Sequence, residues 1–321
     1  MGSQGHRVIV ALMVVCASVG NAAQPALIDQ IVRQTAACQR LMPLTLEIGD
    51  GSSTLHTSTY GKGAPRSDEP LRVASATKWI SAAYFLEKLP EPIPHAASLG
   101  LRMLTGRTFF DGCDTTPTVA ACFQHRRNSR LNPRDVGLFS YGSGHFAGLA
   151  MEMGLGPMTS KDLGREVQAV LGVSEVEFFA PNFAAGGVVT TRAYVRFLRK
   201  LLAGQLKMSR YLGLDPVCTL PRDCPKARGS IVPVNFTYSY GHWVEQTPQG
   251  IGDGVFSSVG MWGFYPWINP RDGTYGVIAA RSSNSQAYLS ALDCGARIRS
   301  AGPLAPPSPA KLLSGTPVDR E

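Results

Sequence analysis

Apolar and polar residues alternate in some segments of the chain and recur at helical spacing in others. Residues 44–48 alternate apolar with polar side chains, and Asp50 and Gly51 follow, a pair typical of a hairpin turn. The pattern therefore predicts two paired strands near the N-terminus. Three further strands are expected near the C-terminus, over residues 235–246, 257–268 and 274–281.

Helical spacing predicts helices before, between and after these strands. Residues 72–89 are apolar nearly all round, which is typical of a helix at the centre of a domain. Thr159 and Asp162 have the spacing of a capping box, and Thr190 or Thr191 is expected to cap the helix that follows. The remaining helices are expected over residues 25–41 and 286–294.

The order of these elements is helix, two strands, helices, three strands, helix. It predicts an α+β fold, in which a five-stranded antiparallel sheet is flanked by the N- and C-terminal helices and a mostly helical domain is inserted between its strands. A cleft at the junction of the two parts would be the natural site for a ligand. We expect one domain over residues 24–301, with the α/β part at about 24–72 and 230–301 and the helical part at about 73–229.

The first 23 of the 321 residues resemble a secretory leader, with Arg7, an apolar core at 8–15, and cleavage after Ala22 or Ala23. The apolar stretch is too short for a membrane span, so we expect a periplasmic or secreted chain with no span after cleavage. Residues 302–321 are rich in Pro and Ser and predict a flexible tail. The net charge of +8 is scattered, and no nucleic-acid motif accompanies it.

Cleavage would remove Cys16 and leave six cysteines, an even number that favours disulfides in an exported chain. Their spacings fit no zinc site, so we expect no metal and no cofactor; six buried free thiols are the alternative. Two pairs would close short loops, and the third would join the N- and C-terminal helices. The predicted pairs are Cys113–Cys122, Cys218–Cys224 and Cys38–Cys294.

Ser75 and Lys78 are three residues apart at the start of the apolar helix, so they share a face of it. The free N–H groups of a first helical turn favour a developing oxyanion. A buried lysine loses solvation, which lowers its pKa and makes the neutral amine available as a base. The pair can therefore activate a serine nucleophile without histidine, although the spacing alone also occurs by chance.

Four segments in order resemble the penicillin-recognising serine hydrolases, which include class C β-lactamases, D-alanyl-D-alanine carboxypeptidases and related esterases. "VASATKWISAAYFLEKL" resembles the nucleophile helix, and "FSYGSGHFAGLAMEMG" resembles the Tyr-x-Asn loop with the helix after it. "NFAAGGVVTTRAYVRFLRKLL" and "SSVGMWGFYPWINPRDGTYGVIAA" resemble the two later motifs, the second being the strand with Lys-Thr-Gly or His-x-Gly. The resemblance covers roughly residues 44–294 and implies a β-lactamase/transpeptidase-like fold.

The resemblance implies a role for each matching residue. Ser75 would be the nucleophile, Lys78 its base, and Tyr141 a second acid/base that protonates the leaving group. The amides of Ser75 and Met261 would form the oxyanion hole.

Two positions depart from the family pattern. Ser143 replaces the Asn of Tyr-x-Asn, and Ser258 replaces the cation of the last motif, whose glycine is Gly260; all three are expected to bind substrate. The lost cation normally helps to hold a substrate carboxylate, so neutral esters or amides suit this chain better. His145 is expected to be a surface residue at a helix start rather than a replacement, and His242 to lie beside the edge of the sheet.

The leading interpretation is an exported serine hydrolase that acts through an acyl-enzyme on a small-molecule ester or amide. A D-alanyl-D-alanine carboxypeptidase or a true β-lactamase is the first alternative, disfavoured by the loss of the cation at Ser258. The second is a non-catalytic relative that binds a cell-wall or partner ligand in the same cleft. Intact Ser75, Lys78 and Tyr141 argue against it, and the two departures argue for it.

Overall fold

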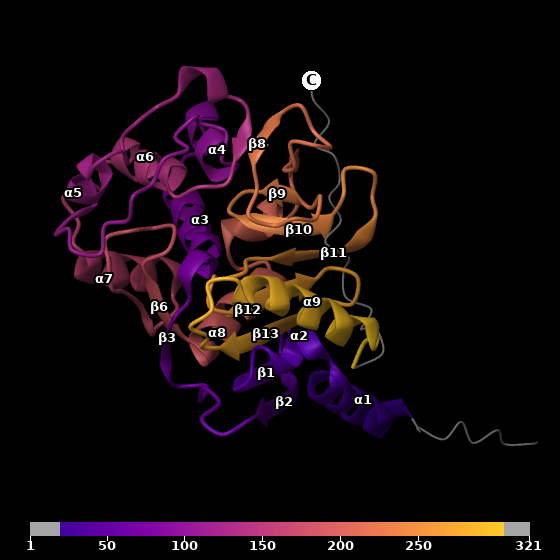
Figure 1. Cartoon of the computed structure of the whole chain (residues 1–321). Coiled ribbons are helices and arrows are strands. Elements are labelled where there is room, and N and C mark those ends of the chain that lie inside the picture. Colours follow the sequence, from indigo (N-terminus) through magenta and orange to yellow (C-terminus); the bar gives the residue numbers. More distant parts are fainter. Residues whose placement is uncertain (1–19, 305–321) are drawn as a thin grey trace, which may run out of the picture.

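The computed structural model describes residues 20–304 (Figure 1). The expected leader and tail fall mostly outside this range. The helices are α1 (Gly20–Gln34), α2 (Ala36–Gln39), α3 (Thr77–Lys88), α4 (His95–Leu101), α5 (Val119–Gln124), α6 (Gly144–Glu152), α7 (Ser160–Leu171), α8 (Thr191–Leu202) and α9 (Ala287–Ser300), with 3₁₀ turns η1 (Ala74–Ala76), η2 (Pro133–Asp135) and η3 (Lys207–Tyr211). The strands are β1 (Leu44–Asp50), β2 (Thr54–Tyr60), β3 (Pro70–Arg72), β4 (Phe139–Ser140), β5 (Val176–Phe178), β6 (Gly187–Thr190), β7 (Val217–Cys218), β8 (Ala227–Gly229), β9 (Thr237–Ser239), β10 (His242–Gln246), β11 (Gly252–Ser257), β12 (Tyr265–Asn269) and β13 (Thr274–Ala280).

The main sheet has the order β2-β1-β13-β12-β11-β10-β9-β7, and its characterised ladders are antiparallel. This confirms the predicted α+β fold, but the main sheet has eight strands rather than the five expected. Two of the three C-terminal segments expected as single strands contain a reversal, at Gly241 (φ 82°) and Gly263 (φ 91°), whereas residues 274–280 form the single strand β13. Glycine adopts such positive φ values without the steric cost that a side chain brings, so each of these two segments folds back and contributes to two strands.

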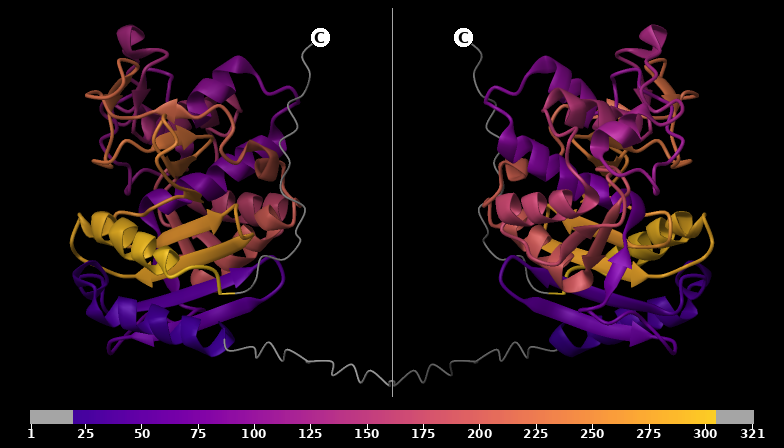
Figure 2. Two further views of the ribbon diagram at one scale, coloured as in Figure 1. Left: turned by 90° about the vertical axis from the view of Figure 1, so that its right-hand side faces the viewer. Right: turned by 90° about the vertical axis from the view of Figure 1, so that its left-hand side faces the viewer.

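Helices cover both faces of this sheet. Tyr265 and Tyr275 lie on opposite faces, because the register pairs Tyr265 with Ile278, three residues beyond Tyr275. Tyr265 accepts a hydrogen bond from Arg299 of α9, whereas Tyr275 accepts one from Arg199 of α8. The predicted neighbourhood of the N- and C-terminal helices is confirmed, since α1 and α2 pack against α9 (Figures 1 and 2).

The helix that begins after Ser75 runs through the middle of the molecule, between the α4–α6 region and β3 (Figure 1). Every residue of α3 from Thr77 to Leu86 is buried, as its nearly continuous apolar pattern predicts. Two smaller sheets, β3-β6-β5 and the parallel pair β4-β8, lie outside the main sheet. The division of the chain into an α/β part and a helical part stays a prediction.

The predicted caps are also observed. Thr159 and Asp162 form a reciprocal capping box at the start of α7, which ends at Gly172 in the left-handed conformation. Thr190 caps α8 by accepting a hydrogen bond from the Ala193 amide.

His242 differs from its predicted position. It lies in β10, inside the sheet rather than at an edge, and is fully buried. Its ring stacks on Trp79 of α3 at 5.6 Å between centroids, and its Nε2 accepts a hydrogen bond from the Gly213 amide. The residue is therefore part of the packing between α3 and the sheet.

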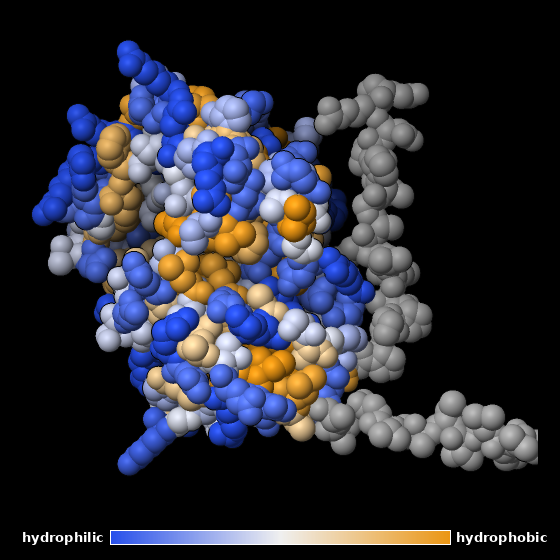
Figure 3. All heavy atoms as spheres, turned by 45° about the vertical axis from the view of Figure 1, so that its right-hand side comes forward, coloured by the Kyte–Doolittle hydropathy of each residue, from blue (hydrophilic) through white to orange (hydrophobic). Residues whose placement is uncertain are grey.

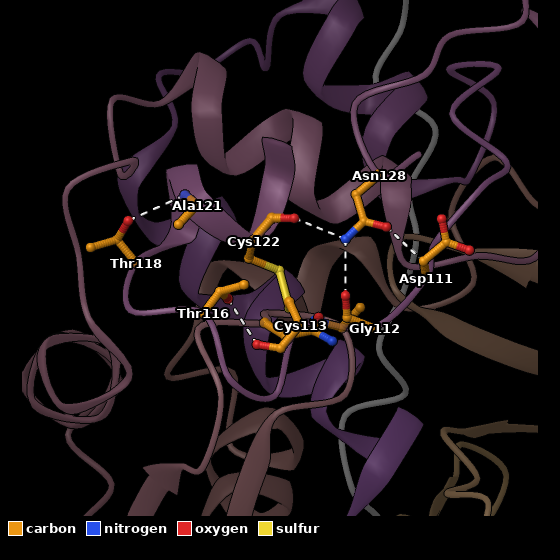
Figure 4. Close-up of a disulfide and its surroundings, with 10 residues drawn as sticks. Asp111, Gly112, Cys113, Thr116, Thr118, Ala121, Cys122 and Asn128 are labelled. Atoms are coloured by element: carbon orange, nitrogen blue, oxygen red, sulfur yellow. Dashed lines mark hydrogen bonds between the residues drawn. A yellow bond between two sulfur atoms is a disulfide. The ribbon is translucent and has the colours of Figure 1, made fainter. Parts of the chain in front are cut away.

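The structure contains all three predicted disulfides. Cys38–Cys294 joins α2 to α9 over 256 residues of sequence, and Cys218–Cys224 spans six. Figure 4 shows Cys113–Cys122, which ties an irregular segment to α5. Beside it the buried Asn128 amide donates to the carbonyls of Gly112 and Cys122, while its oxygen accepts from the Asp111 amide.

On the face drawn in Figure 3 hydrophilic side chains predominate, and apolar surface gathers at mid-height and near the lower edge. Large apolar side chains that are exposed include Leu131, Val136, Ile251 and Met261. Within residues 20–304 no helix has the length and apolar character that crossing a membrane requires.

Because Cys38–Cys294 closes most of the chain into one loop, its loss should release more unfolded-state entropy than loss of the short Cys218–Cys224 loop. We expect the double replacement Cys38→Ser/Cys294→Ser to lower the free energy of unfolding by about 2–5 kcal/mol. The matched control, Cys218→Ser/Cys224→Ser, should lower it by less. Urea denaturation at equilibrium measures both, and equal losses would contradict the expectation.

Candidate active site

Ser75 sits on a turn with an unusual backbone. Ala74, just before it, has φ 45°, a left-handed value that is rare for a residue with a side chain. The Thr77 hydroxyl donates to the Ala74 carbonyl at 2.6 Å and accepts from the Gly187 amide at 3.0 Å. Such local strain persists only where the surroundings hold it, and here β6 and α3 together do so. The turn leaves Ser75 half-buried at the start of α3.

The segment after β11 supports the same turn from the sheet side. The Ser258 hydroxyl donates to the Ser75 carbonyl at 3.2 Å. A Cβ atom on Gly260 would lie 2.2 Å from the Val73 carbonyl oxygen, so no other residue fits there without a shift of the backbone. The predicted positions Ser258 and Gly260 therefore lie against the Ser75 turn. Ser258 itself is only 3% exposed, and its hydroxyl is turned toward backbone.

Lys78 is buried directly beneath Ser75. Its Nζ lies 3.0 Å from the Ser75 Oγ and 3.0 Å from the Ala184 carbonyl oxygen. The side chain is 1% exposed, and loss of solvation lowers the pKa of Lys78 to about 7. A neutral amine in this position can donate to Ala184 and accept the proton of the Ser75 hydroxyl.

Tyr141 completes the cluster. The Lys78 Nζ is 4.8 Å from the centre of the Tyr141 ring, which stacks on Trp243 of β10 at 5.2 Å. Burial raises the pKa of Tyr141 above its usual range, and a hydrogen-bonding contact with Ser75 opposes part of this rise. The phenol thus stays protonated near neutral pH and can serve as a proton donor beside Ser75.

The backbone amides of Ser75 and Met261 are the two groups expected to bind an incoming oxygen. Within the part of the chain that the structure describes, neither the Ser75 nor the Met261 amide donates a hydrogen bond. Met261 lies in the turn between β11 and β12, with 46% of the residue exposed. These are the two amides expected to form an oxyanion hole.

Ser143 lies at the start of α6 and is half-buried. No hydrogen bond joins its side chain to Lys78 among the described residues, so it takes no observed part in the Ser75–Lys78 contact. The next residue, Gly144, is covered by backbone, since a Cβ atom there would lie 2.6 Å from the Arg107 carbonyl oxygen. The segment at Arg107 thus forms a wall over the loop that follows Tyr141.

The expectation of a surface position for His145 is wrong, because the side chain is fully buried. Its Nδ1 lies 2.7 Å from the Thr105 hydroxyl and its Nε2 lies 2.8 Å from the Ser140 carbonyl oxygen. Burial lowers the pKa of His145 to about 4, so the ring is neutral and can donate to Ser140. His145 therefore positions the residue before Tyr141 and supplies no charge to the site.

Three contributors were missed by the sequence reasoning: the Ala184 carbonyl, the Thr77 hydroxyl and the His145 ring. Gly187, where a Cβ atom would lie 2.7 Å from the Thr77 hydroxyl oxygen, lets the chain pass close to α3 and was the available signal for the first two. Among residues 20–304, no group of three His, Cys, Asp or Glu side chains is placed to hold a metal ion.

Comparison with solved structures finds the same architecture in several proteins. A D-amino acid amidase from Ochrobactrum anthropi with bound D-phenylalanine superposes with a TM-score of 0.64 at 13% identity, covering 87% of this chain and 98% of that one. A penicillin binding protein from Bacillus halodurans superposes with a TM-score of 0.59 at 14% identity, covering 83% of this chain and 98% of that one. Unliganded simvastatin synthase from Aspergillus terreus superposes with a TM-score of 0.57 at 16% identity, covering 87% of this chain and 98% of that one.

No protein-family model matches the sequence, and no curated protein matches it either. The structural likeness confirms the predicted resemblance at the level of the fold. The chain has the β-lactamase/transpeptidase-like fold that these proteins share.

The lowered pKa of Lys78 predicts a dependence of stability on pH. The unfolded chain keeps the usual lysine pKa of 10.5, so between pH 7 and 10.5 the unfolded state binds more protons than the folded state. Stability from this group therefore rises with pH, by at most about 1.4 kcal/mol per unit.

Urea denaturation should show that the free energy of unfolding of the wild type, relative to that of Lys78→Met, rises from pH 7 to pH 9.5. Lys88→Met is the matched control, because Lys88 lies on the same helix but is exposed and paired with Glu166. A difference that does not change with pH would mean that Lys78 titrates normally.

Proposed function

We propose that this protein is a serine hydrolase that acts on an ester or amide through an acyl-enzyme. The observation that carries the proposal is the contact between a buried amine and a half-buried hydroxyl, Lys78 Nζ to Ser75 Oγ at 3.0 Å. Burial supplies the neutral amine that a base needs near pH 7. The neighbours of the same fold include an amidase, which supports hydrolysis of this kind.

Acylation would begin when Lys78 takes the proton of Ser75 and the Oγ bonds to the substrate carbonyl carbon. The negative charge then moves to the carbonyl oxygen, where the amides of Ser75 and Met261 donate to it. As the tetrahedral intermediate collapses, the bond to the leaving group breaks and Tyr141 donates its proton to that group. The proton on Lys78 then returns to the tyrosine, which leaves a neutral amine and a Ser75 ester.

Deacylation would use the same groups in reverse. Water takes the place of the leaving group and attacks the Ser75 ester, while Tyr141 accepts its proton and passes a proton to Lys78. The same two amides stabilise the second oxyanion, and Ser75 leaves with a proton. No step requires a metal or an organic cofactor.

The surroundings of Ser75 bear on the choice of substrate. Ser258 stands where the related motif carries a cation, and its buried hydroxyl contributes no charge to a bound ligand. This supports an ester or amide that needs no cation at that position, rather than a D-alanyl-D-alanine carboxypeptidase or β-lactamase substrate. The intact contact between Ser75 and Lys78 speaks against a protein that only binds its ligand.

We further propose that the protein acts in the periplasm or after secretion. Disulfides persist in oxidising compartments, and the described chain contains three of them. The basic and apolar segments at residues 7–15 are consistent with export.

The test is hydrolysis of p-nitrophenyl esters and D-amino-acid amides by the wild type and four variants. Ser75→Ala and Lys78→Ala should each reduce kcat/KM by about 10³-fold or more, and the double variant should lose little further, because the two residues act as a unit. Lys88→Ala, which removes an exposed lysine from the same helix, should retain activity.

Near-normal turnover by Lys78→Ala would contradict the assignment of the base. A wild type that hydrolyses none of the substrates and takes up no fluorophosphonate at Ser75 would favour the binding protein instead. Acylation by penicillin at a rate matching that of the esters would favour the carboxypeptidase or β-lactamase alternative.

A further inference from the structure

A cavity of about 280 Å³ is lined by residues that are close in sequence to the Ser75 turn and to Met261. Its wall is formed by the end of β3 at Leu71 and Arg72, by Trp262 in the turn after β11, and by the end of β13 at Ala280. Both chain segments lead directly to the proposed oxyanion hole, because Ser75 follows Arg72 by three residues and Met261 precedes Trp262. The cavity therefore adjoins the place where a substrate carbonyl would bind.

The order of strands indicates which part of a substrate would enter the cavity. Ser258, at the end of β11, contacts Ser75, while the proposed proton donor Tyr141 stacks on Trp243 of β10. The cavity borders β13, which lies on the other side of β11 in the sheet order β10-β11-β12-β13. The leaving group faces its proton donor, so the acyl group extends toward the cavity.

Arg72 gives this cavity an unused positive charge. Among the described residues it forms no ion pair and no side-chain hydrogen bond, although it is exposed. Its guanidinium lies 4.2 Å from the centre of the Phe179 ring, which restrains the group through a cation–π contact. The other arginine of the cavity, Arg281, is already paired with Glu69 at 2.5 Å.

We propose that the cavity binds a carboxylate on the acyl group of the substrate, with Arg72 as the residue that selects for it. The proposal rests on the proposed hydrolase function and narrows its substrate class to acyl groups that end in an acid. A guanidinium forms paired hydrogen bonds with a carboxylate, and Trp262 and Leu71 provide apolar surface for the carbons between. Because three residues of chain span at most about 10 Å, Arg72 is close enough to Ser75 for a short dicarboxylic acid to reach both.

This cation does not replace the one missing at Ser258. The Ser258 hydroxyl is bonded to the Ser75 carbonyl, whereas Arg72 ends β3, three residues before Ser75, and lines the cavity. Arg72 would thus bind a carboxylate at the distal end of the acyl group, away from the reacting bond. A substrate that is neutral where it contacts Ser258 and carries an acid where it contacts Arg72 fits both the missing cation and the arginine that is unpaired in the described part of the chain.

The experiment compares p-nitrophenyl hydrogen adipate with methyl p-nitrophenyl adipate, which differ in one charge. The wild type should have the higher kcat/KM for the acid, mainly through a lower KM. Arg72→Gln should reduce this preference about three- to fivefold, the range of a partly exposed ion pair, and Arg72→Lys should restore part of it. Raising the ionic strength should weaken the preference in the wild type but not in Arg72→Gln.

Arg66→Gln is the matched control, because it removes the same charge from an exposed arginine that is paired with Asp68 and does not line the cavity. Its preference should equal that of the wild type. A wild type without preference for the acid, or a preference that survives Arg72→Gln, would overturn the proposal.

Failure of the hydrolase function would be visible separately. If Ser75→Ala hydrolyses both esters as the wild type does, the function is wrong, and binding of adipate can still be followed through the fluorescence of Trp262. Loss of that signal in Arg72→Gln, with Trp262→Phe as the spectroscopic blank, would support the anion site. An equal signal with and without Arg72 would refute it.

Discussion

The burial of the Lys78 amine, which has no acidic partner among residues 20–304, is the constraint on which the rest of the site depends. Lys78 lies on a helix that is enclosed on all sides, and hydrogen bonds from Nζ to Ser75 and Ala184 hold it there. Burial disfavours the charged form, so the same packing that stabilises α3 also lowers the pKa of Lys78 to about 7, as the proposed base requires. A lysine in the first turn of an exposed helix would keep its charge and could not deprotonate a serine at neutral pH.

The surrounding elements maintain this arrangement at some cost in backbone strain. Ala74 adopts a left-handed conformation, and Thr77, Gly187 and Gly260 hold or accommodate the turn from two sides. Tyr141 is placed by a different set of contacts, through Trp243 and the neutral His145 behind Ser140. The segment after β11, the central helix and β6 thus each hold the turn that carries Ser75.

Local signals predicted the local structure well. The capping box at Thr159, the cap at Thr190 and the hairpin at Asp50 depend on residues close in sequence, so the pattern was enough. The Ser75–Lys78 contact follows from helical spacing, and the resemblance supplied Tyr141, Ser258 and Met261.

Other features depend on contacts between distant segments and could not be read from the pattern. The buried His145 ring is bonded to Thr105, which is 40 residues away in the sequence and which no local pattern indicates as its partner. Likewise, the lack of an acidic partner for Arg72 among residues 20–304 becomes visible only when the positions of the acidic side chains around β3 are known.

The most direct measurement of the central claim is the rate at which a fluorophosphonate modifies Ser75 as a function of pH, followed by intact mass. If Lys78 is the base, the rate should rise as the amine loses its proton and level off above an inflection near pH 7, the value to which burial lowers its pKa. Lys78→Ala should lose both the inflection and most of the rate. A wild-type inflection near 10, or an unchanged inflection in the variant, would show that Lys78 does not activate Ser75.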